Sequence, residues 1–285
     1  MIDKKLLKKR FSQNAATYDR YAGVQKRMAH RLMAEIDLEK REKTEGMRIL
    51  EVGCGTGYLT GMLCRCFPGA RITAVDIAPG MIEVAKKRTA GHPVNFCCGD
   101  IEELTPEGEY ELVVSNATFQ WLNHPGRTIK RLFSLLGDGG MLAFSTFGSL
   151  TFNELHTSFE RAAANLGGGS SAPPGLSFFS LEDMIGVCRR FMAGSSETPF
   201  AVTGKECLEI DTFPSVRDFL ASVKKIGAGN ASPDRYCLRP ALLKEMMRIY
   251  QNDFSRGNKV RATYHCLFIV VHKQATLKVA VGYKL

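Results

Sequence analysis

The sequence contains no run of about 18 consecutive apolar residues, which is the length that a membrane-spanning helix requires. Its first ten residues are basic, and no apolar signal segment follows them. Cysteines at zinc-ligand spacing are also missing. The nine cysteines are irregularly placed, and Cys64–Cys66 and Cys97–Cys98 do not form the paired two-residue gaps of a zinc site. We therefore expect a cytoplasmic protein with reduced, mostly buried thiols and no metal site.

The composition is that of an ordinary globular protein. The 285 residues are 45% hydrophobic and 24% charged, without the polar bias of a disordered chain. The formal net charge of +9 indicates an acidic partner, which can be nucleic acid, a membrane surface or an acidic protein. Charge alone does not choose among these partners.

Strand-like and helix-like segments alternate through the first half of the chain. The strand-like segments lie at 48–52, 71–76, 94–98, 110–115 and 140–146, and the helix-like segments lie at 57–66, 79–90 and 124–136. Alternating units of this length imply parallel strands joined by right-handed crossovers. We predict an α/β fold with a doubly wound, mostly parallel sheet of seven strands, in the Rossmann-like class.

The pattern loosens after Phe147, which suggests insertions into this sheet. Further helices are predicted near 151–165, 180–191, 214–226 and 239–252, and further strands within 197–210 and over 262–271. We expect segments 148–178 and 211–258 to form a helical lid over the edge of the sheet where open α/β sheets bind ligands. The predicted organisation is N-terminal helices 1–45 over the cofactor site, a core of 46–147, 179–210 and 259–273, and a tail 274–285.

A glycine-rich loop follows the first predicted strand. Gly53, Gly55 and Gly57 alternate in it, whereas the dinucleotide fingerprint needs its last two glycines three residues apart. Glu51 places a carboxylate at the end of the strand. That carboxylate would repel a pyrophosphate but suits a ligand that carries an ammonium and a sulfonium. The loop therefore predicts an S-adenosylmethionine site.

Polar residues also end the next three strands. Asp76, followed by Ile77, is placed to take both ribose hydroxyls. Asp100 is placed to accept from the adenine amine while Ile101 lies on the ring, and Asn116 is placed near the methionine part. The other interpretation is that the two aspartates are helix N-caps. Four polar strand ends in register behind the glycine loop favour a cofactor cleft.

Five segments carry a resemblance to a known family. They are Phe11–Asp19 with Gln25, the loop Glu51–Gly57, Ser115–Trp121, Ser145–Gly148 and Ala262–His265. Over these segments, and nearly from end to end, the sequence resembles class I methyltransferases of the malonyl-acyl-carrier-protein O-methyltransferase group.

The resemblance implies methyl transfer from S-adenosylmethionine to the free carboxylate of a malonyl thioester on acyl carrier protein. The methyl ester then primes pimeloyl synthesis for biotin. A malonyl carboxylate is ionised at neutral pH and needs no general base. A dry site would favour the transition state, in which opposite charges neutralise each other, and alignment of oxygen, methyl and sulfur would supply much of the remaining rate.

Aromatic residues are our candidates for the walls of such a site. They are Tyr18, Tyr21, Phe119 and Trp121. Tyr18 lies at the predicted hinge between two N-terminal helices, and we assign it to the cofactor site together with Gln25. Trp121 is the only tryptophan and is equally compatible with a place in the core.

Tyr264 and His265 are our candidates for orienting the substrate carboxylate by hydrogen bonding. Both lie within a predicted strand, in which adjacent residues face opposite sides. One of the two at most is therefore expected to point into the pocket. We favour Tyr264, because a lone histidine is more often structural.

Basic residues cluster at four places. They are Lys4, Lys5, Lys8, Lys9 and Arg10; Lys26 and Arg27; Arg127, Lys130 and Arg131; and Lys224 and Lys225. A basic rim would steer an acidic carrier protein toward the lid. Each cluster taken alone is also compatible with a solvated helix face.

Three alternatives share parts of this pattern. A nucleic-acid methyltransferase would be basic, but those that act on adenine amino groups carry an Asn/Asp-Pro-Pro-aromatic motif where this chain has Asn116–Phe119, so we expect no nucleic-acid partner. An enzyme that methylates a small-molecule carboxylate or a quinone precursor would keep the same cofactor site. A non-catalytic cofactor-binding protein on the same fold is the third.

Overall fold

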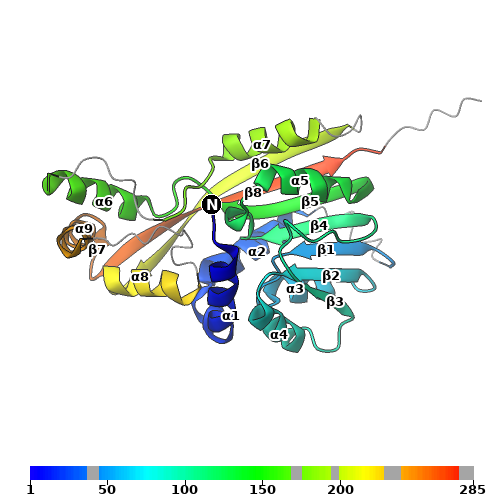
Figure 1. The fold of residues 1–285 in the computed structure, drawn as a ribbon, viewed down its shortest axis with the longest axis horizontal. Coiled ribbons are helices and arrows are strands. Elements are labelled where there is room, and N and C mark those ends of the chain that lie inside the picture. The colour runs from blue at the N-terminus through cyan, green and yellow to red at the C-terminus, as the bar shows by residue number, and fades with distance from the viewer. Residues whose placement is uncertain (37–44, 168–174, 194–198, 228–238, 276–285) are drawn as a thin grey trace, which may run out of the picture.

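The computed structural model describes residues 1–36, 45–167, 175–193, 199–227 and 239–275 (Figure 1). Within them a sheet runs in the order β3-β2-β1-β4-β5-β8-β6, and a two-residue strand β7 pairs with β8. The strands are β1 Arg48–Val52, β2 Arg71–Asp76, β3 Val94–Cys98, β4 Tyr110–Asn116, β5 Leu136–Phe147, β6 Phe200–Phe213, β7 Ser255–Arg256 and β8 Lys259–Lys273.

The helices lie on both faces of the sheet, as a doubly wound fold requires. They are α1 Lys4–Tyr21, α2 Gly23–Glu35, α3 Tyr58–Cys66, α4 Pro79–Arg88, α5 Pro125–Ser134, α6 Asn153–Asn165, α7 Leu181–Ala193, α8 Val216–Lys225 and α9 Pro240–Asp253. Apolar residues of α2, α3 and α4 pack on one face, and those of α5 and α7 pack on the other. The prediction of a doubly wound, mostly parallel sheet is confirmed.

Strand direction divides the sheet into two parts. Strands β1 to β5 are parallel, whereas β8 is antiparallel to both β5 and β6. The central parallel strands β1 and β4 are buried over most of their length, which agrees with their continuous apolar sequences, whereas β3 at the edge has no fully buried residue. Their carboxyl ends meet at one edge, so the polar residues that follow them share that edge.

Two strands are longer than the sequence pattern predicted. β6 continues to Phe213 and β8 begins at Lys259, and the two remain paired along this whole length. Residues 211–213, which we assigned to the lid, are therefore strand. β6 is an edge strand of the sheet, and its alternation of half-buried and exposed residues shows that one of its faces is packed while the other faces solvent.

Helices α6, α8 and α9 gather where β6 and β8 extend beyond the other strands (Figure 1). α6 packs against α9, and α8 contacts both α9 and α1. Buried aromatic side chains join them, among them Phe219, whose ring lies 5.1 Å from that of Phe152 and 5.8 Å from that of Tyr250. Parts of both predicted lid segments (168–174 and 228–238) and most of the predicted tail (276–285) lie outside the described residues.

The N-terminal helices differ from the prediction in one respect. α1 continues through Tyr18 to Tyr21, and the helical conformation is interrupted at Ala22 before α2 begins. Tyr18 therefore lies in the last turns of a helix and not on a hinge, because the sequence around it contains no helix-breaking residue. None of the described helices is long and apolar enough to cross a membrane.

Candidate active site

The glycine loop after β1 is held by backbone contacts that exclude larger residues. The N–H groups of Gly53 and Cys54 donate to the carbonyl of Val75, at 2.8 and 3.0 Å. Gly53 has φ +73°, and a Cβ there would come within 2.8 Å of the Cβ of Thr118. Gly57 has φ +77°, and its Cβ would lie 2.9 Å from the Cα of Ala85 in α4. The loop can follow this path only with glycine at both positions.

Asp76 at the end of β2 supports this loop. One carboxylate oxygen accepts from the N–H of Gly55 and the other from the N–H of Ala78, both at 2.8 Å. The N-cap of α4 is Ala78, so the interpretation of Asp76 as a helix N-cap is wrong. Burial raises the pKa of Asp76 to about 6, against the two N–H donors that lower it. Asp76 and Ile77 line a cavity with Gly53 and Gly55, and each carboxylate oxygen keeps a second lone pair for a ligand hydroxyl.

The buried carboxylate of Glu51 tests whether the residues of the site fit the cofactor. Its side chain is 1% exposed, and its Oε2 has no hydrogen-bond partner among the described residues. Burial raises the pKa of Glu51 to about 8. Glu51 lines a small cavity with Tyr18, Gly53 and Asn116. A buried carboxylate oxygen without a partner is costly, and the ammonium of a methionine moiety would complete it. The donor set therefore fits S-adenosylmethionine.

Asp100 and Ile101 line the cavity to which Asp76 contributes, and not the small cavity beside Glu51. Ile101 is buried. The Asp100 carboxylate accepts from the N–H of Glu102 at 3.0 Å and pairs with Lys4. The residues between β3 and β4 form turns and no helix, so Asp100 is not a helix N-cap either.

The two small cavities, one lined by Asp76 and the other by Glu51, together form what we call the cofactor groove. This groove adjoins a larger cavity, and the side chains at the junction are Tyr18, Gln25 and Asn116. Tyr18 and Asn116 line both parts of the groove, and Tyr18 and Gln25 also line the larger cavity. The Asn116 amide donates to the backbone carbonyl of Gln25 at 3.0 Å, and its oxygen accepts from Ser145 at 2.7 Å. Asn116 therefore ties α2 to the sheet. Burial raises the pKa of Tyr18, which keeps its phenol neutral.

The larger cavity has a volume of about 780 Å³ and lies between α1, the helices α6, α8 and α9 of the predicted lid, and β8. Aromatic side chains dominate its wall, among them Tyr18, Trp121, Phe147, Phe152 and Tyr264. The charged side chains that line it are basic: Arg10, Lys224 and Lys225. No aspartate or glutamate is among its described lining residues. We call it the acceptor cavity.

Tyr264 and His265 face opposite sides of β8, as the alternation along a strand requires. Tyr264 lines the acceptor cavity, with its ring 4.9 Å from that of Phe152, and burial raises its pKa. His265 lies 2.9 Å by Nε2 from a Glu206 carboxylate oxygen, and its Nδ1 accepts from the N–H of Leu150 at 3.3 Å. His265 is not among the residues that line the cavity. The prediction that His265 orients the substrate is wrong on this geometry.

The aromatic candidates also divide into residues that line the site and residues that do not. Trp121 lines both the cofactor groove and the acceptor cavity, with its ring edge-on to Phe11 at 5.6 Å. Phe119 is 2% exposed and stacks on Phe144 at 4.0 Å, so the prediction that it walls the site is wrong. Tyr21 is likewise absent from the lining of either space.

Two residues of the site were not recognised from the sequence. Asp19 accepts from Thr56 at 2.7 Å and pairs with Arg88, which ties the end of α1 to the glycine loop and α4. His156 lines the acceptor cavity, and burial lowers its pKa, so it is neutral at pH 7. The only signal for Asp19 was its place in the Phe11–Asp19 segment. His156 carried no signal in the sequence pattern.

Comparison with known proteins identifies the family. Residues 49–140 match the methyltransferase domain family. The chain is 48% identical over 273 residues to the malonyl-[acyl-carrier protein] O-methyltransferase of Priestia megaterium, covering 96% of this chain and 99% of that one. The chain belongs to the malonyl-[acyl-carrier protein] O-methyltransferase family. A second member, from Acetivibrio thermocellus, is 48% identical, with coverages of 96% and 95%.

Solved structures agree with the fold. The YcgJ protein of Bacillus subtilis superimposes with a TM-score of 0.55 at 11% identity, covering 87% of this chain and all of that chain. The plantazolicin methyltransferase BpumL in complex with SAH gives a TM-score of 0.51 at 15% identity, covering 95% and 97%. As a member of its family the chain is an S-adenosylmethionine-dependent methyltransferase.

Proposed function

We propose that this enzyme transfers the methyl group of S-adenosylmethionine to the free carboxylate of a malonyl group carried on acyl carrier protein. The product is the malonyl methyl ester that primes pimeloyl synthesis for biotin. The named relatives are 43–48% identical over about 96% of the chain in several bacteria. One structural observation carries the proposal. A groove lined by buried carboxylates meets, at Tyr18, a cavity whose charged lining residues are basic.

The charges of the two spaces match the charges of the two reactants. The groove presents Glu51 and Asp76, together with Asp100 in its pair with Lys4, to a cofactor that bears an ammonium and a sulfonium. The acceptor cavity presents the basic side chains of Arg10, Lys224 and Lys225 to an anionic acceptor. This complementarity supports an arrangement in which the cation and the anion meet from opposite sides of Tyr18.

The chemistry needs orientation and exclusion of water more than it needs a base. When bound, S-adenosylmethionine supplies an electrophilic methyl group on its sulfonium. Tyr18 and Trp121 line both spaces and would shield the reacting atoms from water, which favours a transition state in which charge is neutralised. The neutral Tyr264 phenol would donate a hydrogen bond that orients the carboxylate. An ion pair at that position would lower its nucleophilicity.

An acidic carrier would dock on the rim between α1 and α8. Lys224 and Lys225 end α8 as exposed residues, and Arg10 lines the same cavity from α1. Four other predicted docking residues make internal contacts. Lys4 pairs with Asp100 and Glu102, Lys26 donates to the Asp19 carbonyl, Arg27 pairs with Glu209 and Asp211, and Arg131 donates to the Glu102 carbonyl. We exclude these four from the docking surface.

A comparison of acceptors tests the proposal. The enzyme is incubated with methyl-labelled cofactor and malonyl-carrier protein, free malonate, tRNA or DNA in parallel. We expect label in the carrier fraction and none in nucleic acid. Label in tRNA or DNA without label in carrier contradicts the proposal, and equal efficiency with free malonate favours a small-molecule enzyme. Absence of transfer to every acceptor favours a cofactor-binding protein.

A further inference from the structure

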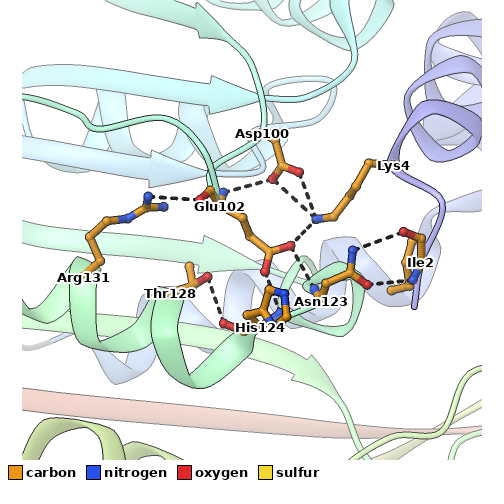
Figure 2. Close-up of polar contacts among 8 residues, drawn as sticks. All are labelled: Ile2, Lys4, Asp100, Glu102, Asn123, His124, Thr128 and Arg131. Carbon is orange, nitrogen blue, oxygen red and sulfur yellow. Dashed lines mark hydrogen bonds and ion pairs between the residues drawn. The ribbon is translucent and has the colours of Figure 1, made fainter. Parts of the chain in front are cut away.

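Lys4, at the start of α1, is held by two carboxylates at the adenine end of the cofactor groove (Figure 2). Its Nζ lies 2.6 Å from Glu102 Oε2 and 3.3 Å from Asp100 Oδ2. The three side chains are only 21%, 11% and 12% exposed. An ion pair that is largely withdrawn from solvent is screened less than a surface pair. Lys4 also lines the cofactor groove.

Glu102 is the fixed partner in this cluster. Its carboxylate accepts from the backbone N–H groups of Asn123 and His124, at 2.9 and 2.6 Å. Burial alone would raise the pKa of Glu102, but Lys4 and these two N–H groups lower it overall. The carboxylate is therefore ionised and anchored to the start of α5. Lys4 is the partner that comes from another part of the chain.

A second contact fastens the same end of the chain. The Ile2 N–H donates to the Asn123 side-chain oxygen at 2.7 Å, and the Asn123 amide donates back to the Ile2 carbonyl at 3.1 Å (Figure 2). Asn123 thus holds both Ile2 and Glu102. We call Ile2, Lys4, Asp100, Glu102 and Asn123 the adenine-end clasp.

The clasp fixes a helix that covers the groove from end to end. Lys4, Leu7, Phe11 and Tyr18 of α1 all line the groove, and their spacing of three, four and seven residues places them on one helix face. The far end of α1 is fastened by Asp19, which pairs with Arg88. The main space beneath α1 measures about 90 Å³, below the roughly 300 Å³ at which small-molecule sites begin. Outward movement of part of α1 would enlarge this space for a ligand.

We propose that Lys4 is a positioning residue for cofactor exchange. By pairing with Asp100 and Glu102 it fixes the Asp100 carboxylate at the adenine end and fastens α1 across the groove. The cofactor and its product then exchange only when the clasp opens. This inference rests on the cofactor and not on the identity of the acceptor, so it stands or falls separately from the proposed function.

Binding kinetics test the clasp directly. Trp121 is the only tryptophan and lines the groove, so its fluorescence in stopped flow reports binding and release of S-adenosylhomocysteine. Lys4→Met should release this product about tenfold faster than the unmodified enzyme and bind it no more slowly. Lys4→Arg should restore slow release. Lys5→Met, which changes the adjacent exposed lysine, should match the unmodified enzyme.

The salt dependence of release is a readout that a merely structural role would not move, and hydrogen exchange reports whether α1 is loosened. When the clasp opens, its charges become exposed to solvent, where salt stabilises them as separate ions. Release from the unmodified enzyme should therefore accelerate with salt, and release from Lys4→Met should not. Glu102→Gln should behave as Lys4→Met does, and residues 1–12 should exchange amide hydrogens faster in both. An unchanged release rate in folded Lys4→Met, a slower association rate, or an equal effect of Lys5→Met would overturn the proposal.

Discussion

The cofactor groove and the acceptor cavity differ in how they are built and in what they offer a ligand. The groove lies at the ends of short, buried parallel strands, and backbone hydrogen bonds to Val75 and Asp76 fix its loop. The acceptor cavity lies between α1 and lid helices carried on the extensions of β6 and β8, and it is much larger, about 780 Å³. We therefore propose that the sheet recognises the cofactor and that the lid recognises the acceptor.

The groove is acidic and the acceptor cavity is basic, and this difference follows from how the two are built. Buried carboxylates on strand ends are costly alone, as the raised pKa values of Glu51 and Asp76 show. A cationic ligand relieves that cost. The acceptor cavity keeps its basic residues near the exposed rim and its aromatic residues inside, which suits an anion attached to a large protein. Four substitutions, given in decreasing order of expected effect, test this difference between the groove and the acceptor cavity.

Gly53→Ala should damage the groove most and leave the acceptor cavity intact. The new Cβ would overlap Thr118 at a backbone φ of +73°. We expect affinity for S-adenosylhomocysteine, measured by calorimetry, to fall more than tenfold, or by over about 1.4 kcal/mol. Gly91→Ala is the matched control, since its φ is +91° but nothing lies within 4 Å of the new Cβ. A Gly53→Ala variant with unchanged affinity would contradict the account of the loop.

Glu51→Gln should uncouple cofactor binding from pH. The pKa of Glu51 in the folded protein is about 8, so below that pH a cation must displace a proton. Affinity of the unmodified enzyme should rise by up to about tenfold per pH unit between about pH 6 and pH 8. The Gln variant should bind more weakly and show no such rise. Calorimetry in buffers of different ionisation enthalpy would detect the released proton.

The carboxyl group of Glu51 should also make the free energy of unfolding fall as pH rises. Its pKa is raised on folding, so between its unfolded value of 4.5 and about 8 the folded state holds a proton that the unfolded state has lost. The contribution of Glu51 to the free energy of unfolding therefore falls with rising pH across that window. Denaturant unfolding of Glu51→Gln should lack this decline. A parallel decline in both proteins would assign it to other groups.

Tyr264→Phe should impair the acceptor side alone. It removes one hydroxyl from the acceptor cavity, so we expect kcat/KM for the malonyl carrier to fall about threefold to tenfold, the size of one hydrogen bond. Affinity for S-adenosylhomocysteine should stay unchanged. Tyr110→Phe is the control, because that hydroxyl donates to the Glu107 carbonyl away from either space. A change in affinity for S-adenosylhomocysteine without a change in kcat/KM would assign Tyr264 to the cofactor groove and contradict its place on the acceptor side.

Replacing Lys224 and Lys225 by Gln should have the smallest effect. Exposed charges contribute little individually, so we expect KM for the malonyl carrier to rise about threefold at low salt and to converge with that of the unmodified enzyme at high salt. Lys86 and Lys87 are an equally exposed pair in the last turn of α4 and form the control. Equal effects of both double variants would mean that the carrier is attracted by net charge alone.

Local patterns predicted the groove well. The glycine loop and the residues that end β1 to β4 are adjacent in sequence to the strands that place them, so their grouping follows from parallel topology. The opposite facing of Tyr264 and His265 follows from the two-residue period of a strand. These features need no knowledge of distant contacts.

Features that depend on distant packing were predicted less well. Phe119 and Trp121 share a short 3-10 turn, and which of them turns inward depends on Phe144, 25 residues away by the sequence numbering. The clasp joins Lys4 to residues nearly one hundred positions further along the chain, and a basic cluster gives no sign that one member is paired. Sequence pattern therefore favoured a solvated or docking role for Lys4, which the ion pairs exclude.

The most direct measurement locates the transferred methyl group on the acyl chain. After reaction with malonyl-carrier protein, the acyl group is released by cleavage of its thioester and analysed by NMR and by treatment with an esterase. We predict a methyl ester on the malonyl carboxylate oxygen, which an esterase removes. A methyl group on the central carbon, which has the same mass but resists the esterase, or on the carrier polypeptide, would contradict the account.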